Sequence, residues 1–139
     1  MFGATLHVVH VVDDINARAL GLTGFPEQMP ALVDAQRELE AAARQSLDRL
    51  VSDDDRRRLT VTPVVLTGTM AATAILEYAR DALIDLIIVG THGRGAVAQF
   101  FMGSVADRLV RAAPCPVLTV RHPEHEFLRP DALERTARR

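Results

Sequence analysis

The apolar residues of this chain fall into short runs separated by longer periodic stretches. The runs are rich in β-branched residues and are bounded by glycine, proline or charged residues, which is typical of strands. The predicted strands are Ala4–Val12, Leu59–Leu66, Leu83–Val89 and Pro116–Arg121. Pro63 lies inside the second run. Because proline cannot donate to a ladder, we expect that run to be an edge strand.

Between the runs, apolar residues recur at steps of three and four, as on one face of a helix. This spacing predicts helices over Ala31–Val51, Met70–Ala82 and Ser104–Ala113. The predicted buried stripe of the first helix is Leu32, Ala35, Leu39, Ala43, Leu47 and Leu50. Strands that alternate with helices favour a doubly wound α/β fold with a parallel sheet, because each helix covers the sheet while the chain returns to the same end.

Three stretches lack a clear period. Ile15–Pro30 contains two glycines and two prolines and predicts a loop with little structure of its own. The run Asp53–Arg58 predicts a solvated turn of mixed charge. Residues 122–139 are mostly polar and too poor in apolar side chains to pack as another layer, so we expect a C-terminal tail there. The α/β domain is therefore expected over residues 1–121.

Composition narrows the function classes. A length of 139 residues fits one domain, and nearly half of the residues are apolar. The net charge is -2, and no dense basic stripe occurs outside the tail, which argues against nucleic acid as the main partner. No apolar run approaches the roughly 20 residues that span a bilayer, and the N-terminus lacks a signal-peptide pattern. We therefore expect a cytoplasmic protein with no membrane partner.

The cysteine and the histidines do not indicate a metal centre. Cys115 is the only cysteine, which excludes an intrachain disulfide and leaves a cysteine-based site without ligands. His7 and His10 are three residues apart on a predicted strand, so they point to opposite faces and cannot chelate one metal from it. His122 and His125 lie in the polar tail. No metal site and no catalytic residue is predicted.

Residues Gly90–Ser104 form a glycine-rich connection between the third predicted strand and the third predicted helix. In open α/β sheets ligands bind beyond the carboxyl ends of the strands, where a helix N-terminus offers free N–H groups and partial positive charge. Gly90, Gly93 and Gly103 lack side chains, so the backbone there can take positive φ and approach a phosphate closely. This combination predicts a phosphate site.

Other residues of the connection have more than one interpretation. Ser104 adds a hydroxyl at the start of the helix, and with Asp107 it matches a capping box that needs no ligand. Arg94 could reach a phosphate and His92 could donate to one, although either could equally face solvent. The stretch is not a Walker A motif, and its early spacing, G-x-x-G-x-G, is not that of the dinucleotide fingerprint.

The glycine pattern resembles the ATP-binding motif of the universal stress protein family. Gly90, Gly93, Gly103 and Ser104 match G-x-x-G, nine residues, G-S, between an apolar strand that ends in VG and a following PCPVLTV. Together with the HVVD segment that ends at Asp13, the likeness extends from about Gly3 to the end of the last strand. It implies the Rossmann-like fold of the adenine nucleotide alpha hydrolase-like group, with strand order 3-2-1-4-5.

What the resemblance implies is an ATP site, with or without Mg²⁺, whose phosphates lie on the glycine-rich connection and whose base lies near the end of the first strand. Val11 matches a family position near the adenine and ribose. The candidate nucleotide-binding residues are Val11, Gly90, His92, Gly93, Arg94, Gly103, Ser104 and Val105. The resemblance also implies a homodimer through the last strand, Pro116–Arg121, which would otherwise be an exposed edge.

The sequence departs from the family at its start. In the family a central strand, which carries an aspartate that contacts adenine, and a helix precede the segment that begins here at Gly3. No residue can take that aspartate's role, and without the strand a gap of about 10 Å would separate Ala4–Val12 from Leu83–Val89. We expect the domain to be N-terminally incomplete, because nothing in MFGATLHVV replaces what is absent. A strand from another chain or direct pairing of the two neighbours are the alternatives.

The leading hypothesis is an ATP-binding stress or regulatory module with at most slow hydrolysis, because no general base is evident. His92 is the only residue of the connection that titrates near neutral pH, and Asp85 lies within the preceding predicted strand. The alternative is a ligand-free dimerisation module of the same fold. An adenylating or electron-transfer enzyme is disfavoured, because the chain has no SGG-type pyrophosphate loop and no HIGH-like element.

Overall fold

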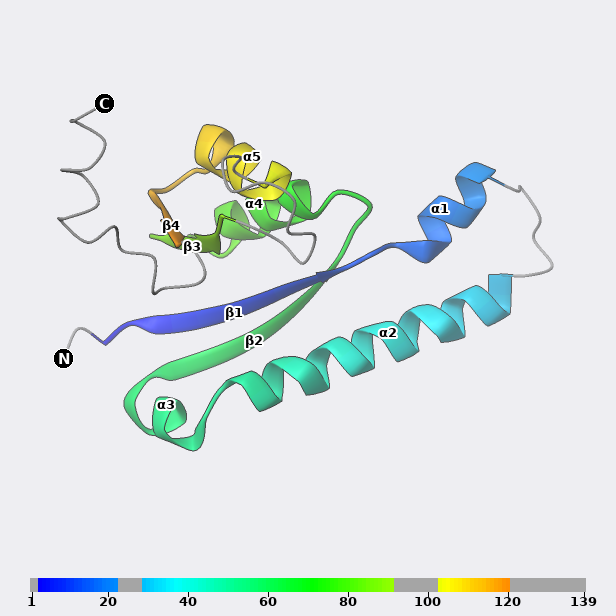
Figure 1. Ribbon diagram of the computed structural model, residues 1–139. Coiled ribbons are helices and arrows are strands. Elements are labelled where there is room, and N and C mark those ends of the chain that lie inside the picture. The colour runs from blue at the N-terminus through cyan, green and yellow to red at the C-terminus, as the bar shows by residue number, and fades with distance from the viewer. Residues whose placement is uncertain (1–2, 23–28, 92–102, 121–139) are drawn as a thin grey trace, which may run out of the picture. The chain divides into compact units, whose positions relative to one another are not determined.

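The computed structural model describes residues 3–22, 29–91 and 103–120, and the chain divides into two compact units (Figure 1). The elements of the unit Met1–Ala82 are β1 (Thr5–Val12), α1 (Ile15–Leu22), α2 (Met29–Leu50), α3 (Asp53–Arg58), β2 (Thr60–Thr67) and α4 (Ala71–Asp81). Those of the unit Leu83–Arg139 are β3 (Ile87–Gly90), α5 (Ser104–Ala112) and β4 (Val117–Val120). The predicted strands and helices are present, with bounds that differ by a few residues.

Both strand pairs are parallel, as the alternation of strands and helices predicted. β1 pairs with β2, and β3 pairs with β4. When β1 to β4 are matched to strands 2 to 5 of the expected order 3-2-1-4-5, these pairs are its neighbours 2-3 and 4-5. No helix within the described ranges is both long and apolar enough to cross a membrane.

The β1–β2 ladder explains how a proline is tolerated in β2. The register runs from Thr5 opposite Thr60 to Val12 opposite Thr67, and the Gly68 N–H donates to the Val12 carbonyl at 3.1 Å. Backbone groups of alternate residues point to the same side of a strand, so the even-numbered residues of β2 face β1. Pro63 therefore turns its missing N–H to the outer edge, where it costs no ladder hydrogen bond.

Helices cover both faces of this strand pair. The His7 ring on β1 lies 2.6 Å, from Nδ1 to Oη, from the Tyr78 hydroxyl of α4. On β2, the Thr67 hydroxyl donates to Glu40 Oε1 of α2 at 2.7 Å. His7 and Thr67 have opposite parity in the register, and side chains of alternate residues point to opposite faces. α4 therefore covers one face and α2, which runs along the strands in Figure 1, covers the other.

The buried stripe of α2 differs from the predicted one. Leu39 and Leu50 are 44% and 73% exposed, whereas Ala43 and Leu47 are buried as expected. The stripe continues toward the N-terminus of the helix through Gln36, which is only 6% exposed. The prediction was wrong here because it counted apolar side chains alone, and a buried position on this helix is occupied by an amide.

The prediction of a loop with little structure of its own over Ile15–Pro30 was wrong for its first half, which forms α1. Two hydrogen bonds start the helix: the Asp14 carboxylate accepts from the Ala17 N–H at 2.8 Å, and Gln36 Oε1 accepts from the Ile15 N–H at 3.0 Å. Aspartate is a good N-cap, because its oxygen satisfies an N–H that has no partner within the helix. The second bond comes from α2 and could not be read from local sequence.

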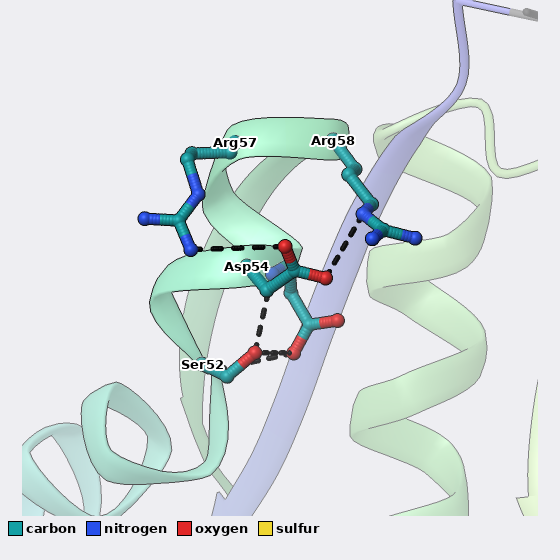
Figure 2. A network of polar contacts seen from close by, with 5 residues as sticks. Ser52, Asp54, Arg57 and Arg58 are labelled. Atoms are coloured by element: carbon teal, nitrogen blue, oxygen red, sulfur yellow. Dashed lines mark hydrogen bonds and ion pairs between the residues drawn. The ribbon is translucent and has the colours of Figure 1, made fainter.

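The charged run Asp53–Arg58 forms a one-and-a-half-turn helix, α3, rather than a turn, and it is exposed as predicted. Ser52 caps it through a capping box: its hydroxyl accepts from the Asp55 N–H at 3.1 Å, and the Asp55 carboxylate accepts from the Ser52 N–H at 3.1 Å. Figure 2 shows Asp54 between Arg57 and Arg58, with the nearest atoms 3.7 and 2.9 Å apart. Such exposed ion pairs contribute little stability, so the cap decides that a helix forms.

We predict that Ser52→Ala lowers the free energy of unfolding by about 1 kcal/mol at pH 7. The hydrogen bonds from the Ser52 hydroxyl and backbone hold the pKa of Asp55 below its ordinary value of 3.8. A carboxylate whose pKa is lower in the folded than in the unfolded protein stabilises the fold at pH values above its unfolded pKa. This stabilisation is lost as the pH falls through the folded pKa. The difference between variant and wild type, measured by urea unfolding, should therefore narrow below about pH 4.

Ser46→Ala is the matched control for this variant. The Ser46 hydroxyl donates to the Ala42 carbonyl within α2, a bond that contributes little to a helix interior. Its stability should stay within about 0.5 kcal/mol of wild type at every pH. Equal losses in the two serine variants, or a Ser52→Ala loss that grows in acid, would contradict the capping account.

In the second unit, the predicted strand Leu83–Val89 begins only at Ile87. Leu83, directly after the C-cap of α4, has φ +51 and is 83% exposed. This left-handed conformation normally belongs to glycine at the end of a helix, and it turns the chain before the strand starts. α5 covers the strand pair with Ala106 and Leu109, which are buried with Ile87.

We predict that Leu83→Gly raises the free energy of unfolding by up to about 1 kcal/mol. Glycine adopts φ +51 without the Cβ clash, which costs roughly 1–2 kcal/mol, and this gain exceeds its larger loss of chain entropy. Leu50→Gly is the matched control, because Leu50 is also an exposed leucine but lies in the helix α2. That variant should lose stability in the same thermal unfolding assay, and a loss in both would refute strain at Leu83.

Candidate functional site

The ends of the glycine-rich connection are hydrogen-bonded to each other. Gly90 ends β3, and the next residue, Thr91, donates its N–H to the Val120 carbonyl of β4 at 2.9 Å. The Thr91 carbonyl accepts from the Gly103 N–H at 2.7 Å. The carboxyl end of β3 and the start of α5 are therefore held side by side, as a phosphate site at this place requires.

Within the described residues, no side chain caps the N-terminus of α5. Gly103 is the N-cap residue, and the first backbone bond within the helix runs from the Asp107 N–H to the Gly103 carbonyl at 2.9 Å. The N–H groups of Ser104, Val105 and Ala106 precede that bond and have no partner inside the helix. They are the amides available to an anion at the positive end of this nine-residue helix.

The predicted capping box of Ser104 and Asp107 is wrong. Because Gly103 occupies the N-cap, Ser104 is already the first helical residue and sits one position too late to cap. The Asp107 carboxylate instead accepts from Arg111 Nε, at 3.1 and 3.0 Å for its two oxygens, and this hydrogen bond raises the pKa of Arg111. Ser104 is exposed, so its hydroxyl is accessible, and the one acidic side chain of the first turn is paired with a cation.

Glycine is not required at Gly90 or Gly103 for backbone reasons. Gly103 has φ -58, and Gly3 is the only glycine with positive φ among the described residues. The expectation of positive φ is therefore wrong at both positions, and the Gly103 N–H is already bonded to Thr91. The absence of a side chain matters here only for close approach to the helix start. His92, Gly93 and Arg94 lie outside the described residues.

Val11, the candidate on the base side, lies near the carboxyl end of β1 and is half-buried. It is in register with Leu66. Since the Val12 carbonyl bonds to β2, the Val11 backbone N–H and C=O point to the other edge of β1, away from that ladder. In the described part of the sheet, no strand pairs along that edge. Val11 can therefore offer one donor and one acceptor from its backbone.

A polar cluster that sequence reasoning missed lies at this end of the first unit. Gln36 Nε2 donates to Glu40 Oε1 at 3.3 Å, and the same oxygen accepts from the Thr67 hydroxyl at 2.7 Å. Beside it, Asp13 forms an ion pair with Arg18 Nε at 3.1 Å. The available signal was the spacing of Gln36 and Glu40, which continue the apolar i, i+4, i+7 stripe of α2 with polar residues.

The described residues offer little for acid–base or metal chemistry. The prediction that Asp85 lies within a strand was wrong: it lies in the turn before β3 and is exposed at the opposite end of β3 from Gly90. No group of three or more His, Cys, Asp or Glu side chains in the described ranges could hold a metal ion.

Comparison with known proteins identifies the family. The model of the universal stress protein family matches residues 1–121. The chain belongs to the universal stress protein family. A universal stress protein of Thermus aquaticus, from the QAH/OAS sulfhydrylase 3′ region, is 34% identical over 119 residues, which cover 86% of this chain and 79% of that one. Universal stress protein MJ0531 of Methanocaldococcus jannaschii is 29% identical over 125 residues, 90% of this chain and 69% of that one.

Solved structures confirm the α/β fold of this universal stress protein. UspA of Lactobacillus plantarum aligns with a TM-score of 0.65 and 23% identity over 86% of this chain and 79% of that one. Hypothetical protein MJ0577 aligns with a TM-score of 0.69 and 19% identity over 88% and 78%. These likenesses establish a Rossmann-like, doubly wound α/β fold, as the sequence predicted.

Proposed function

We propose that this universal stress protein binds ATP and acts as a nucleotide-dependent regulatory module in a stress response. The observation that carries the proposal is the N-terminus of α5, where the amides of Ser104, Val105 and Ala106 follow a glycine and have no partner within the described residues. The Thr91–Gly103 bond holds this helix start against the carboxyl end of β3. That is the place where parallel α/β sheets bind phosphates.

The proposed phosphate site consists of the Ser104 and Val105 amides and the exposed Ser104 hydroxyl, with Gly103 leaving room for approach. Gly90, His92, Gly93 and Arg94 join this site on the family motif, and Mg²⁺ accompanies the phosphates where it is bound. On the base side, Val11 contacts adenine and ribose through backbone groups that no described ladder uses. Residues 1–121 form the binding domain, residues 122–139 a tail, and the protein acts in the cytoplasm.

Hydrolysis is at most slow in this proposal. A general base must lie within hydrogen-bond reach of the attacking water, about 2.6–3.2 Å, or act through one further water. Asp85 lies before the start of β3, and Asp107 is held in an ion pair by Arg111. His92 is the remaining titratable candidate of the connection. The protein is therefore expected to report nucleotide occupancy rather than to turn over ATP.

We predict that Gly103→Val lowers ATP affinity at least about tenfold, equal to 1.4 kcal/mol, because the branched side chain covers the amides of α5. The variant should stay folded, since φ -58 and ψ 148 are values that valine adopts. Isothermal titration calorimetry measures the affinity, and circular dichroism checks the fold. Ala112→Val is the matched control, because it adds the same branched side chain at an exposed position at the other end of α5. Unchanged affinity in Gly103→Val would refute the phosphate site.

The same proposal includes a homodimer through β4. Since the Ile87 N–H donates to the Pro116 carbonyl and the Thr91 N–H to the Val120 carbonyl, even-numbered residues of β4 face β3. Val117 and Thr119 therefore present their backbone groups at the outer edge. This four-residue edge contains no charged residue that would oppose pairing with another strand.

We predict that Thr119→Pro shifts the protein from dimer to monomer, because it removes an outward N–H and leaves the bonds to β3 intact. Thr119→Val keeps that N–H and should remain dimeric. Analytical ultracentrifugation with and without ATP measures both. A proline variant as dimeric as wild type would contradict this edge. A wild-type dimer that binds no nucleotide would instead favour the second candidate, a ligand-free dimerisation module of the same fold.

A further inference from the structure

Gln36 is the one polar residue in the buried core among the residues described. It is 6% exposed, and both ends of its amide are bonded: Oε1 accepts from the Ile15 N–H at 3.0 Å, and Nε2 donates to Glu40 Oε1 at 3.3 Å. Burying an amide is costly unless its hydrogen bonds are made, and an apolar side chain could fill a buried helix position without that cost. Its position therefore points to a task other than packing.

The place of these bonds along α2 indicates the task. Ala43 and Leu47 bury the C-terminal half of the stripe, and the stripe becomes polar only where the helix reaches Thr67, the last residue of β2. Gln36 and Glu40 thus lie at the carboxyl end of the β1–β2 pair. This end of a parallel sheet is the one that receives ligands.

The partner of Gln36 is the first residue of α1. Ile15 follows directly on the turn Asp13–Asp14 that leaves β1, and the Gly68 N–H holds the other end of that turn at the Val12 carbonyl, 3.1 Å away. The turn is therefore fixed from β2 on one side and from α2 on the other. Gln36 bonds to the backbone N–H of Ile15, the residue that directly follows this turn.

We propose that Gln36 is a positioning residue for nucleoside recognition: it holds α1 and the turn after β1 in the arrangement that receives the base and ribose. This inference rests on the proposed ATP binding. It assigns Gln36 no contact with the nucleotide and no effect on the phosphate site, whose amides belong to α5. Removal of its bonds should therefore weaken binding of ATP but not of a bare polyphosphate.

The test uses the full chain, with ATP and inorganic tripolyphosphate as ligands in calorimetric titrations. Gln36→Glu sets a second carboxylate against Glu40, and the repulsion between the two displaces the side chain that accepts from the Ile15 N–H. ATP affinity should fall on the order of tenfold, and tripolyphosphate affinity should stay within about twofold. Glu40→Gln added to Gln36→Glu restores a donor–acceptor pair with the roles exchanged, and it should recover most of the ATP affinity. Gln45→Glu, exposed on the same helix, controls for the added charge.

The experiment distinguishes failure of the positioning role from failure of the proposed ATP binding. Equal losses for both ligands, no loss of ATP affinity, or no recovery in the exchanged double variant would overturn the positioning role while the proposed function stands. Wild-type protein that binds neither ATP nor tripolyphosphate would overturn the proposed function, and this inference with it. Circular dichroism of all variants, the double variant included, separates loss of fold from loss of recognition.

Discussion

The parallel pairing of its strands is the constraint on which the rest of this structure depends. Two strands that run in the same direction cannot be joined by a tight turn, so the chain must return across the sheet, and a helix is the usual way. β1 and β2 are joined through α1, α2 and α3, and β3 and β4 through α5. Within each pair, the carboxyl ends of the strands then meet at one edge, and each following helix begins there.

In each unit taken by itself the polar groups gather at the carboxyl edge of the strands, but they do so in two different ways. In the first unit the charged groups have partners: the Asp14 carboxylate caps α1, Asp13 pairs with Arg18, and Glu40 accepts from both Gln36 and Thr67. In the described part of the second unit, no side chain bonds to the amides of Ser104, Val105 and Ala106. Satisfied groups give a rigid surface, and unsatisfied donors give a binding surface.

How far the sequence predicted the structure depends on whether the deciding interaction is local. The strands and the helices α2, α4 and α5 follow from apolar periodicity, because burial on a sheet imposes it. α1 was missed because one of its two starting bonds comes from Gln36, 21 residues away. The predicted strand before Gly90 was too long, because the apolar run does not indicate that Leu83 has φ +51.

The candidate site shows the same division. The glycine pattern correctly predicted a helix, α5, that begins beside the end of β3. The role of each residue, however, depends on backbone geometry that the spacing does not reveal. Gly103 rather than Ser104 is the N-cap, so the capping box inferred from the spacing of Ser104 and Asp107 does not form. A spacing of three residues fits both a cap and an early helical position, and only the backbone decides between them.

These two kinds of surface suggest a division of labour within the proposed ATP site. Charge-assisted bonds from helix amides to phosphate are strong and insensitive to the identity of the base, so α5 would supply most of the affinity. Discrimination between bases instead needs donors and acceptors fixed in place, because a mismatched group is then left unpaired at a cost of about 1–3 kcal/mol. The turn after β1, held by Gly68 and Gln36, has that fixed character. A polar residue in the buried stripe of α2 is therefore what nucleoside selectivity would require, although packing alone would favour leucine.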